Sequence, residues 1–96
     1  MRSPGAQLDF EWDPDKDATN REKHGVSFVE ASSAFFDPLS STIVDTGHSG
    51  EEERFRLIGL TSSGRLVVVT HTDRGEALRL ISARLATRRE RKTYEQ

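Results

Sequence analysis

The sequence contains no cysteine, and it has only one methionine, one tryptophan, one tyrosine and three prolines. The absence of cysteine excludes disulfide bonds, thiol catalysis and zinc sites built on thiolates. The fold must therefore be held by core packing and backbone hydrogen bonds. A chain of this composition fits a reducing compartment.

Long apolar runs are also missing. No segment approaches the roughly 18 consecutive apolar residues of a membrane-spanning helix. The opening stretch, MRSPGAQLDFEWD, lacks the apolar run of a signal peptide, so we expect a cytoplasmic protein without a membrane partner. A chain of 96 residues suffices for one domain with a modest core and is too short for two. We assign residues 8–96 to that domain and residues 1–7 to an N-terminal extension.

Charge is unevenly distributed along the chain. Residues 1–53 carry 12 acidic residues against 4 Lys/Arg, a net charge of -8, whereas residues 54–96 carry 10 Lys/Arg against 4 acidic residues, a net charge of +6. A basic half can form a phosphate-binding surface even when the whole chain is nearly neutral. Alternatively, the two halves attract one another within the fold. Charge alone does not separate these interpretations.

The N-terminal part of the domain predicts a strand followed by a helix. In LDFEWD, residues 8–13, apolar and acidic side chains alternate with the period of two of a half-buried strand. Asp13 before Pro14 is typical of a helix N-cap with proline at the first helical position. Gly25 favours a left-handed C-terminal cap, so we expect this helix to end near His24.

A second helix is expected from about Phe28 to Phe36. Ser27 and Glu30 have the spacing of a capping box, and Val26 and Ala31 are placed for a hydrophobic staple. The apolar residues of this segment recur on one helical face, which we expect to enter the core.

The rest of the chain predicts an antiparallel sheet and a C-terminal helix. STIVDT, residues 41–46, is a short β-branched stretch. Three strand-like runs follow, with short glycine-containing turns between them, at residues 54–61, 65–72 and 76–84. Thr87 and Glu90 form a second capping box and predict a short final helix. Segregated elements of this kind define an α+β domain: a small antiparallel sheet, a three-stranded meander plus the N-terminal and short strands, with two N-terminal helices and one C-terminal helix.

Arginines within the predicted strands define a candidate chemical face. If the first turn of the meander pairs Thr61 with Arg65, then Arg54 and Arg56 project to the same side of the sheet. Arg79 and Arg84 are separated by an odd number of residues, so a regular strand would point them to opposite faces. They can line one face only if a bulge intervenes or the strand ends before Arg84.

Arg88 and Arg89 fall in the first turn of the predicted last helix. The helix dipole disfavours cations there by roughly 0.3–1 kcal/mol each, whereas free backbone N–H groups beside guanidinium forks favour a phosphate. We therefore interpret this turn as a phosphate-binding element. A solvated basic turn is the alternative.

Five motifs occur in an order that resembles the BrnT toxins of bacterial type II toxin-antitoxin systems. They are W-D-x-x-K from Trp12, N-x-x-K-H-G-V-S-F from Asn20, H-S-x-x-E-E-R-F from His48, I-G from Ile58, and I-S-A-R-x-A-T-x-x-E-R from Ile81. The resemblance spans about residues 8–95.

The resemblance implies a RelE-like fold and a ribonuclease toxin that inhibits translation without a metal or other cofactor. It also implies a partner, a BrnA-like antitoxin with a ribbon-helix-helix segment. Operator DNA would be contacted only through that antitoxin, in a hetero-oligomer. The alternative within the same fold is a module that binds antitoxin or RNA without cleaving it.

RNA cleavage without a metal needs a base for the 2′-hydroxyl proton, a cation for charge on the phosphorane and an acid for the leaving oxygen. Placed on the family motifs, these requirements favour Arg84 as a phosphate clamp, followed by Arg54 and Arg79. Arginine within apolar strands is costly to bury unless it is paired. Salt bridges to the acidic half are the alternative role, and Arg56 joins Arg88 and Arg89 as an RNA-binding candidate.

Lys23, His24 and His48 complete the candidate catalytic set. Lys23 and His24 end the first helix, where cations also favour the dipole, and histidine is the natural acid or base near neutral pH. His48 beside the glutamates of its loop is a poor zinc signature, so we expect no metal site. We interpret His71 as a satisfied core or sheet-surface histidine and Tyr94 as an anchor of the last helix against the sheet.

Overall fold

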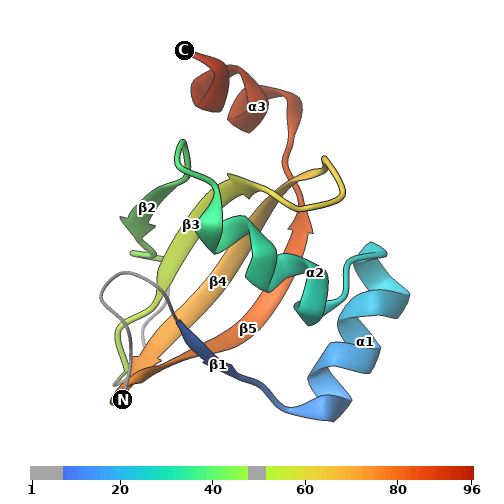
Figure 1. The fold of residues 1–96 in the computed structure, drawn as a ribbon, viewed down its shortest axis with the longest axis vertical. Coiled ribbons are helices and arrows are strands. Elements are labelled where there is room, and N and C mark those ends of the chain that lie inside the picture. Colours follow the sequence, from blue (N-terminus) through green and yellow to red (C-terminus); the bar gives the residue numbers. More distant parts are fainter. Residues whose placement is uncertain (1–7, 48–51) are drawn as a thin grey trace.

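The computed structural model describes residues 8–47 and 52–96, which form a five-stranded sheet with three α-helices (Figure 1). The elements in chain order are β1 (Asp9–Glu11), α1 (Pro14–His24), α2 (Phe28–Ser33), the 3-10 turn η1 (Ala34–Phe36), β2 (Ser41–Val44), β3 (Phe55–Leu60), β4 (Leu66–Arg74), β5 (Ala77–Leu85) and α3 (Arg88–Glu95). The expected α+β class is confirmed. No helix in these two segments is long and apolar enough to cross a membrane.

The sheet has the strand order β1-β5-β4-β3-β2. The central strands β3, β4 and β5 form the expected antiparallel meander, β2 extends it at one edge, and β1 joins β5 in parallel at the other. The amide of Thr61 donates to the carbonyl of Arg65 at 2.8 Å, so the predicted pairing of the first turn is confirmed. In Figure 1, α2 crosses one face of the sheet, α1 lies beside β5, and α3 lies beyond the end of β5.

Helix α1 begins and ends where its sequence signals predict. The carboxylate of Asp13 accepts a hydrogen bond from the amide of Asp15 at 2.8 Å, with Pro14 as the first helical residue. Gly25 ends the helix in the left-handed region at φ 69°, where its amide donates to Arg21 O. A side chain there would strain the backbone, so glycine is required.

The capping box predicted for α2 is only half formed. The hydroxyl of Ser27 accepts from the amide of Glu30 at 3.0 Å, as expected. The carboxylate of Glu30 does not return to Ser27; it accepts from Arg65 at 2.5 and 2.9 Å and from the hydroxyls of Thr61 and Ser63. Glu30 binds Arg65 in preference to the amide of Ser27 because a charged guanidinium is a stronger donor than a backbone amide. Glu30 thereby ties α2 to the β3–β4 turn.

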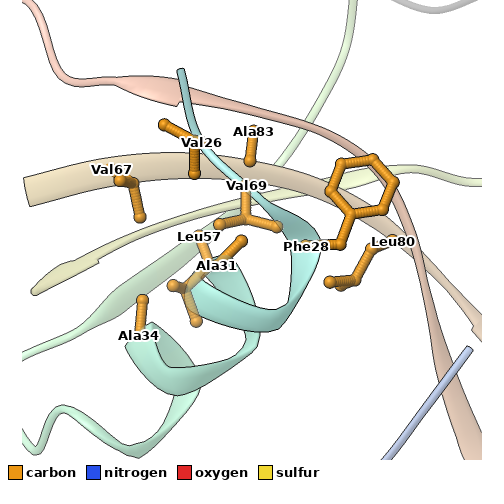
Figure 2. Close-up of a cluster of buried hydrophobic side chains, with 9 residues drawn as sticks. All are labelled: Val26, Phe28, Ala31, Ala34, Leu57, Val67, Val69, Leu80 and Ala83. Atoms are coloured by element: carbon orange, nitrogen blue, oxygen red, sulfur yellow. The ribbon is translucent and has the colours of Figure 1, made fainter. Parts of the chain in front are cut away.

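The core lies between α2 and the adjoining face of the sheet (Figure 2). Its buried side chains are Val26, Phe28, Ala31, Ala34, Leu57, Val67, Val69, Leu80 and Ala83. Val26 and Ala31 are both fully buried, consistent with the predicted staple. Trp12 packs edge-on against Phe28 at 5.9 Å between ring centroids.

Gly59 allows η1 to approach β3 closely. A Cβ atom at Gly59 would lie 2.7 Å from the backbone carbonyl oxygen of Ala34. Real Cβ atoms do not come that close to backbone oxygen, so any side chain would push η1 away from the sheet. The glycine of the I-G motif is therefore a packing requirement.

Asn20 closes the part of the β5 edge that β1 does not cover. Its side-chain amide accepts from the amide of Ala83 at 3.0 Å and donates to the carbonyl of Ala83 at 2.7 Å, as a neighbouring strand would. It also donates to Val26 O at 2.9 Å. Asn20 is 6% exposed, so these groups have no alternative partner in water. The first residue of N-x-x-K-H-G thus joins α1, the α1–α2 turn and the sheet.

Candidate functional site

The face of the sheet opposite α2 carries the arginines selected from the sequence. Leu57 and Val69 project into the core, so their neighbours along β3 and β4 project to the other side. Arg56 lies on that side, as expected from the turn pairing. The amide of Asp45 donates to the carbonyl of Arg54 at 2.8 Å, which continues the β2–β3 pairing by one residue and places Arg54 on the same side. We call this side, defined by Arg54, Arg56, Arg79 and Arg84, the basic face.

A bulge in β5 brings Arg79 and Arg84 onto one face. Thr70 pairs with Ser82 and His71 pairs with Leu80, so Ile81 is an extra residue on β5. On β5, Arg79 precedes the bulge and lies opposite Thr72, and Arg84 follows the bulge and lies opposite Val68. Because positions 68 and 72 of β4 share a face, so do the two arginines. In a regular strand, their odd spacing would place the two arginines on opposite faces. The bulge is one of the two exceptions that the sequence allowed.

Arg84 is held by α3. Its two terminal nitrogens donate to the two carboxylate oxygens of Glu90 at 2.8 and 2.9 Å. The same carboxylate accepts from the amide of Thr87 at 2.8 Å, and the hydroxyl of Thr87 accepts from the amide of Glu90 at 3.1 Å. The predicted capping box is therefore confirmed. It also fixes the guanidinium of Arg84 at the junction of β5 and α3.

This ion pair keeps both partners charged. Hydrogen bonds from Arg84, aided by the amide of Thr87, lower the pKa of Glu90 to about 2 against the opposing effect of burial. The carboxylate of Glu90 in turn raises the pKa of Arg84. The side chain of Arg84 is partly exposed, but both of its terminal nitrogens are occupied by Glu90.

The other arginines of the basic face are less completely paired. Arg79 donates to Glu11 at 2.9 Å, and Nε of Arg56 lies 3.8 Å from Asp45. Arg54 makes no ion pair with any residue in the described segments. The Nε atoms of Arg54 and Arg56 are enclosed and have no hydrogen-bond partner in those segments. Enclosed donors without partners are rare in folded proteins.

Ion pairs also join the acidic and basic halves of the chain. They are Glu11–Arg79, Glu30–Arg65, Asp45–Arg56 and Glu52–Arg74. Attraction between the halves, one of the two interpretations of the charge pattern, therefore operates in the fold. It leaves Arg54 unpaired among the described residues and Arg56 loosely paired.

The start of α3 adds two cations near the basic face. The side chains of Arg88 and Arg89 are exposed and make no ion pair within residues 8–47 and 52–96. Arg89 lines a pocket of about 180 Å³ between α3 and the sheet. The remaining residues lining it are Ser41, Ile43, Arg56, Ile58, Val68, Glu90 and Thr93.

The structure places Lys23 and His24 elsewhere. They line a separate pocket with Asn20, beside the bulge residues Ile81 and Ser82 at the edge of β5. Both side chains are exposed. His48 lies outside the described residues. Within those residues, no group of three or more His, Asp or Glu side chains is arranged to hold a metal ion.

Two interactions anchor α3. For the second of them, the sequence indicated Tyr94 but not its partner Asp37. Besides the Arg84–Glu90 pair, the hydroxyl of Tyr94 donates to Asp37 at 2.5 Å. Asp37 also accepts from the amides of Leu60 and Leu39 at 2.8 and 2.9 Å. Partial burial opposes ionisation of Asp37, but these hydrogen bonds outweigh it and its pKa lies below the usual value. Tyr94 thus anchors α3, as expected, through the carboxylate of Asp37 in the segment between η1 and β2.

His71 is buried in the core, as predicted, but it lacks the expected hydrogen bonds within the described segments. It is 4% exposed and stacks on Phe55, with ring centroids 5.8 Å apart, while Phe35 lies on it at 4.9 Å. Neither ring nitrogen has a hydrogen-bond partner among the described residues, so the prediction of a satisfied histidine was wrong. Burial lowers the pKa of His71, although Asp73 opposes this.

Asn20 and Glu90 are the important residues whose roles sequence reasoning missed. Asn20 was noticed only as part of a motif, although an asparagine in the middle of a helix is itself a signal because its helix propensity is low. Glu90 was recognised as a cap, but its bond to Arg84 required a knowledge of where β5 ends. Both are positioning residues around the strand that carries Arg84.

Comparisons with known proteins agree with this architecture. The family described as the ribonuclease toxin BrnT of type II toxin-antitoxin systems matches residues 12–90. The crystal structure of the Brucella abortus ribonuclease toxin BrnT superimposes with a TM-score of 0.62 at 26% sequence identity, covering 85% of this chain and 100% of that one. No match was found among the curated proteins compared with the sequence.

The fold is thus that of a small α+β toxin with an arginine-bearing sheet. The chain belongs to the BrnT family of ribonuclease toxins of type II toxin-antitoxin systems, as its motifs had suggested. A toxin of this type has a cognate antitoxin as its partner.

Proposed function

We propose that this chain is a metal-independent endoribonuclease whose active surface is the basic face together with the first turn of α3. The observation that carries the proposal is that Arg84 shares the sheet face left open by α2 with Arg56 and Arg54, whose Nε donors have no partner among the described residues. Guanidinium groups suit an RNA backbone, and those of Arg54 and Arg56 can bind a phosphate without first breaking a strong ion pair, whereas Arg84 is engaged by Glu90.

The chemistry proceeds by transfer of the phosphoryl group within the RNA. A base removes the 2′-hydroxyl proton, the 2′-oxygen forms a bond to phosphorus, and the bond from phosphorus to the 5′-oxygen breaks as an acid protonates that oxygen. The products are a 2′,3′-cyclic phosphate and a 5′-hydroxyl. Arg84 stabilises the negative charge on the phosphorane, because preorganised donors are most effective where charge develops. Arg54 and Arg79 are further candidates for this role, and Arg79 lies four positions of β4 away from Arg84.

Proton transfer is assigned to His48, because His24 and Lys23 line a separate pocket at the edge of β5. Glu90, with a pKa of about 2, is ionised at neutral pH and orients Arg84. Arg56, Arg88 and Arg89 bind the flanking RNA.

A second candidate, a module that binds RNA or antitoxin without cleavage, is favoured by one specific observation. Both terminal nitrogens of Arg84 are engaged by Glu90, so a bidentate contact with phosphate requires Arg84 to leave this pair or to use its remaining N–H groups. Both candidate functions use the same surface, but only the first includes cleavage of RNA.

Incubation of the purified protein with RNA in EDTA separates these candidates. Cleavage that persists in EDTA and is lost in Arg84→Ala supports the proposal. Intact RNA at high protein concentration contradicts catalysis and favours the binding module. Cleavage that EDTA abolishes indicates a metal-dependent nuclease instead.

The partner and the cellular role complete the proposal. We expect a BrnA-like antitoxin with a ribbon-helix-helix segment, which brings the toxin to operator DNA within a hetero-oligomer. Release of the toxin in the cytoplasm would inhibit translation by removing RNA. Co-expression with the product of a neighbouring small gene should yield a stable complex and stop RNA cleavage, and a translation assay with added toxin checks the cellular effect.

A further inference from the structure

The pocket between α3 and the sheet has an apolar floor and a charged rim. Ile43 of β2, Ile58 of β3 and Val68 of β4 form the floor. Arg89, Glu90 and Thr93 of α3 close one side, and Ser41 and Arg56 complete the rim. At about 180 Å³ the pocket is smaller than the 300–1,000 Å³ typical of sites for drug-sized ligands, and it has room for one planar ring system.

Strand pairing places this pocket directly beside Arg84. Ser41 pairs with Ile58, Ile58 with Val68, and Val68 with Arg84, so these four residues form one row across the sheet. Glu90 lines the pocket and also binds Arg84. A group seated on Ile58 and Val68 would therefore neighbour a phosphate held by Arg84.

The rim offers unused hydrogen-bond donors. The side chain of Arg56 lines the pocket, and its contact with Asp45 is loose, at 3.8 Å from Nε to the carboxylate. The guanidinium of Arg89 makes no ion pair within those residues. The one carboxylate on the rim, Glu90, already accepts from Arg84 and Thr87. The pocket thus favours a ring whose edge carries acceptors.

We propose that this pocket binds a single-stranded RNA base next to the scissile phosphate, and that it prefers guanine or uracil to adenine. The apolar floor contacts the face of the ring, and Arg56 and Arg89 donate to its carbonyl oxygens. Arginine donors commonly read the O6 and N7 acceptors of guanine, whereas adenine presents an amino group at the equivalent position. This inference rests on the proposed function in placing RNA on the basic face, but it concerns base recognition and not turnover.

Binding of short RNAs that cannot be cleaved tests this pocket. The probes are fluorescent five-nucleotide RNAs with 2′-O-methyl groups, in which the central base is guanine, uracil or adenine and the flanking bases are adenine. Fluorescence anisotropy with the full chain should show about tenfold tighter binding for a central guanine or uracil than for adenine. Equal affinity for all three probes would overturn the proposal.

Two variants and one control locate the preference. Ile58→Phe fills the pocket and Arg89→Gln removes a rim donor from an exposed helix position, so either should reduce the preference to about twofold or less. Val29→Ser is the control, because Val29 is 66% exposed on α2 and lies away from the pocket lining. Circular dichroism checks folding, and Arg89→Gln remains informative if Ile58→Phe does not fold. An unchanged preference in folded Arg89→Gln would contradict the proposal.

A separate cleavage assay distinguishes this inference from the proposed function. Base preference in binding, without cleavage of unmodified RNA, would support the pocket and contradict catalysis. Cleavage without base preference in the anisotropy experiment would support catalysis and contradict the pocket.

Discussion

Arg84 and Glu90 form a two-armed ion pair at 2.8 and 2.9 Å across the junction of β5 and α3. The pair joins the residue most favoured for phosphate chemistry to the residue that begins the last helix. Because Glu90 also accepts from the amide of Thr87, loss of either partner alters both the helix start and the guanidinium. The site and the fold are therefore coupled at this point.

Arg84→Ala is expected to lower kcat for RNA cleavage by about 10²–10³-fold, because it removes a preorganised donor to the phosphorane. Single-turnover cleavage of a defined RNA measures the change. Arg91→Ala is the matched control, since Arg91 is an exposed α3 arginine whose contact with Glu95 spans 4.0 Å. Equal losses in the two variants would show that general positive charge, and not the position of Arg84, supports cleavage.

Asn20→Ala should lower the free energy of unfolding by about 3 kcal/mol, because it leaves the buried backbone groups of Ala83 without partners. Chemical denaturation monitored by circular dichroism measures the change. Thr19→Ala, at the exposed neighbouring position, should stay within about 0.5 kcal/mol of wild type. A loss for Asn20→Ala as small as that of the control would contradict the edge-closing role.

Tyr94→Phe should loosen α3 without unfolding the domain. The change removes the hydrogen bond from Tyr94 to Asp37 and keeps the ring. Hydrogen exchange should become faster in α3 and at the amide of Leu60, which also donates to Asp37, while the amides of β4 keep their protection. Uniform acceleration across the sheet would indicate global destabilisation in place of a local anchor.

His71 should make stability depend on pH near neutrality. Its folded pKa is lowered by burial, so the unfolded chain binds the proton more readily and protonation favours unfolding. The free energy of unfolding should therefore fall as pH drops below the ordinary histidine pKa of about 6.5. In His71→Met, which keeps an apolar group between Phe35 and Phe55, this part of the pH dependence should disappear. A wild-type profile that is flat from pH 7.5 to about 5.5 would contradict the assignment.

Glu30 and Glu90 should govern stability in more acidic solution. Both have pKa values lowered to about 2, Glu30 by Arg65 and Glu90 by Arg84. Their stabilisation is fully present above the unfolded pKa of about 4.5 and is lost as pH falls toward about 2. Glu30→Gln should be less stable than wild type at pH 7 and show a shallower decline between these values in acid denaturation. A decline as steep as that of wild type would show that other carboxylates dominate.

Local signals allowed most elements of the fold to be predicted. Asp13, Gly25 and Thr87 specify helix ends through backbone bonds within a few residues, and the structure confirms these positions. The half-formed box at Ser27 could not be foreseen, because Arg65, the competing donor, reaches Glu30 only after the β3–β4 turn has packed against α2. Local spacing carries no information about such distant competitors.

The basic face was harder to predict than the elements that build it. Residue parity placed Arg54 and Arg56 together, and it holds because β3 is regular and its pairing with β2 continues to the carbonyl of Arg54. Parity failed for Arg79 and Arg84, because whether a strand contains a bulge depends on its pairing with the neighbouring strand. Glu90, the partner of Arg84, lies on α3, so this ion pair could not be predicted from residue spacing within β5. The catalytic roles of these residues stay predictions.

The extra residue Ile81 changes which positions of β5 face the core. Upstream of it, odd-numbered positions face away from α2, and downstream of it even-numbered positions do. A deletion of this one residue would leave every arginine in the sequence and yet rotate half of the strand, sending either Arg79 or Arg84 into the core side. The spatial pattern of charge in this toxin thus depends on an uncharged residue, and alignments of its relatives should be read for the length of this strand as carefully as for its arginines.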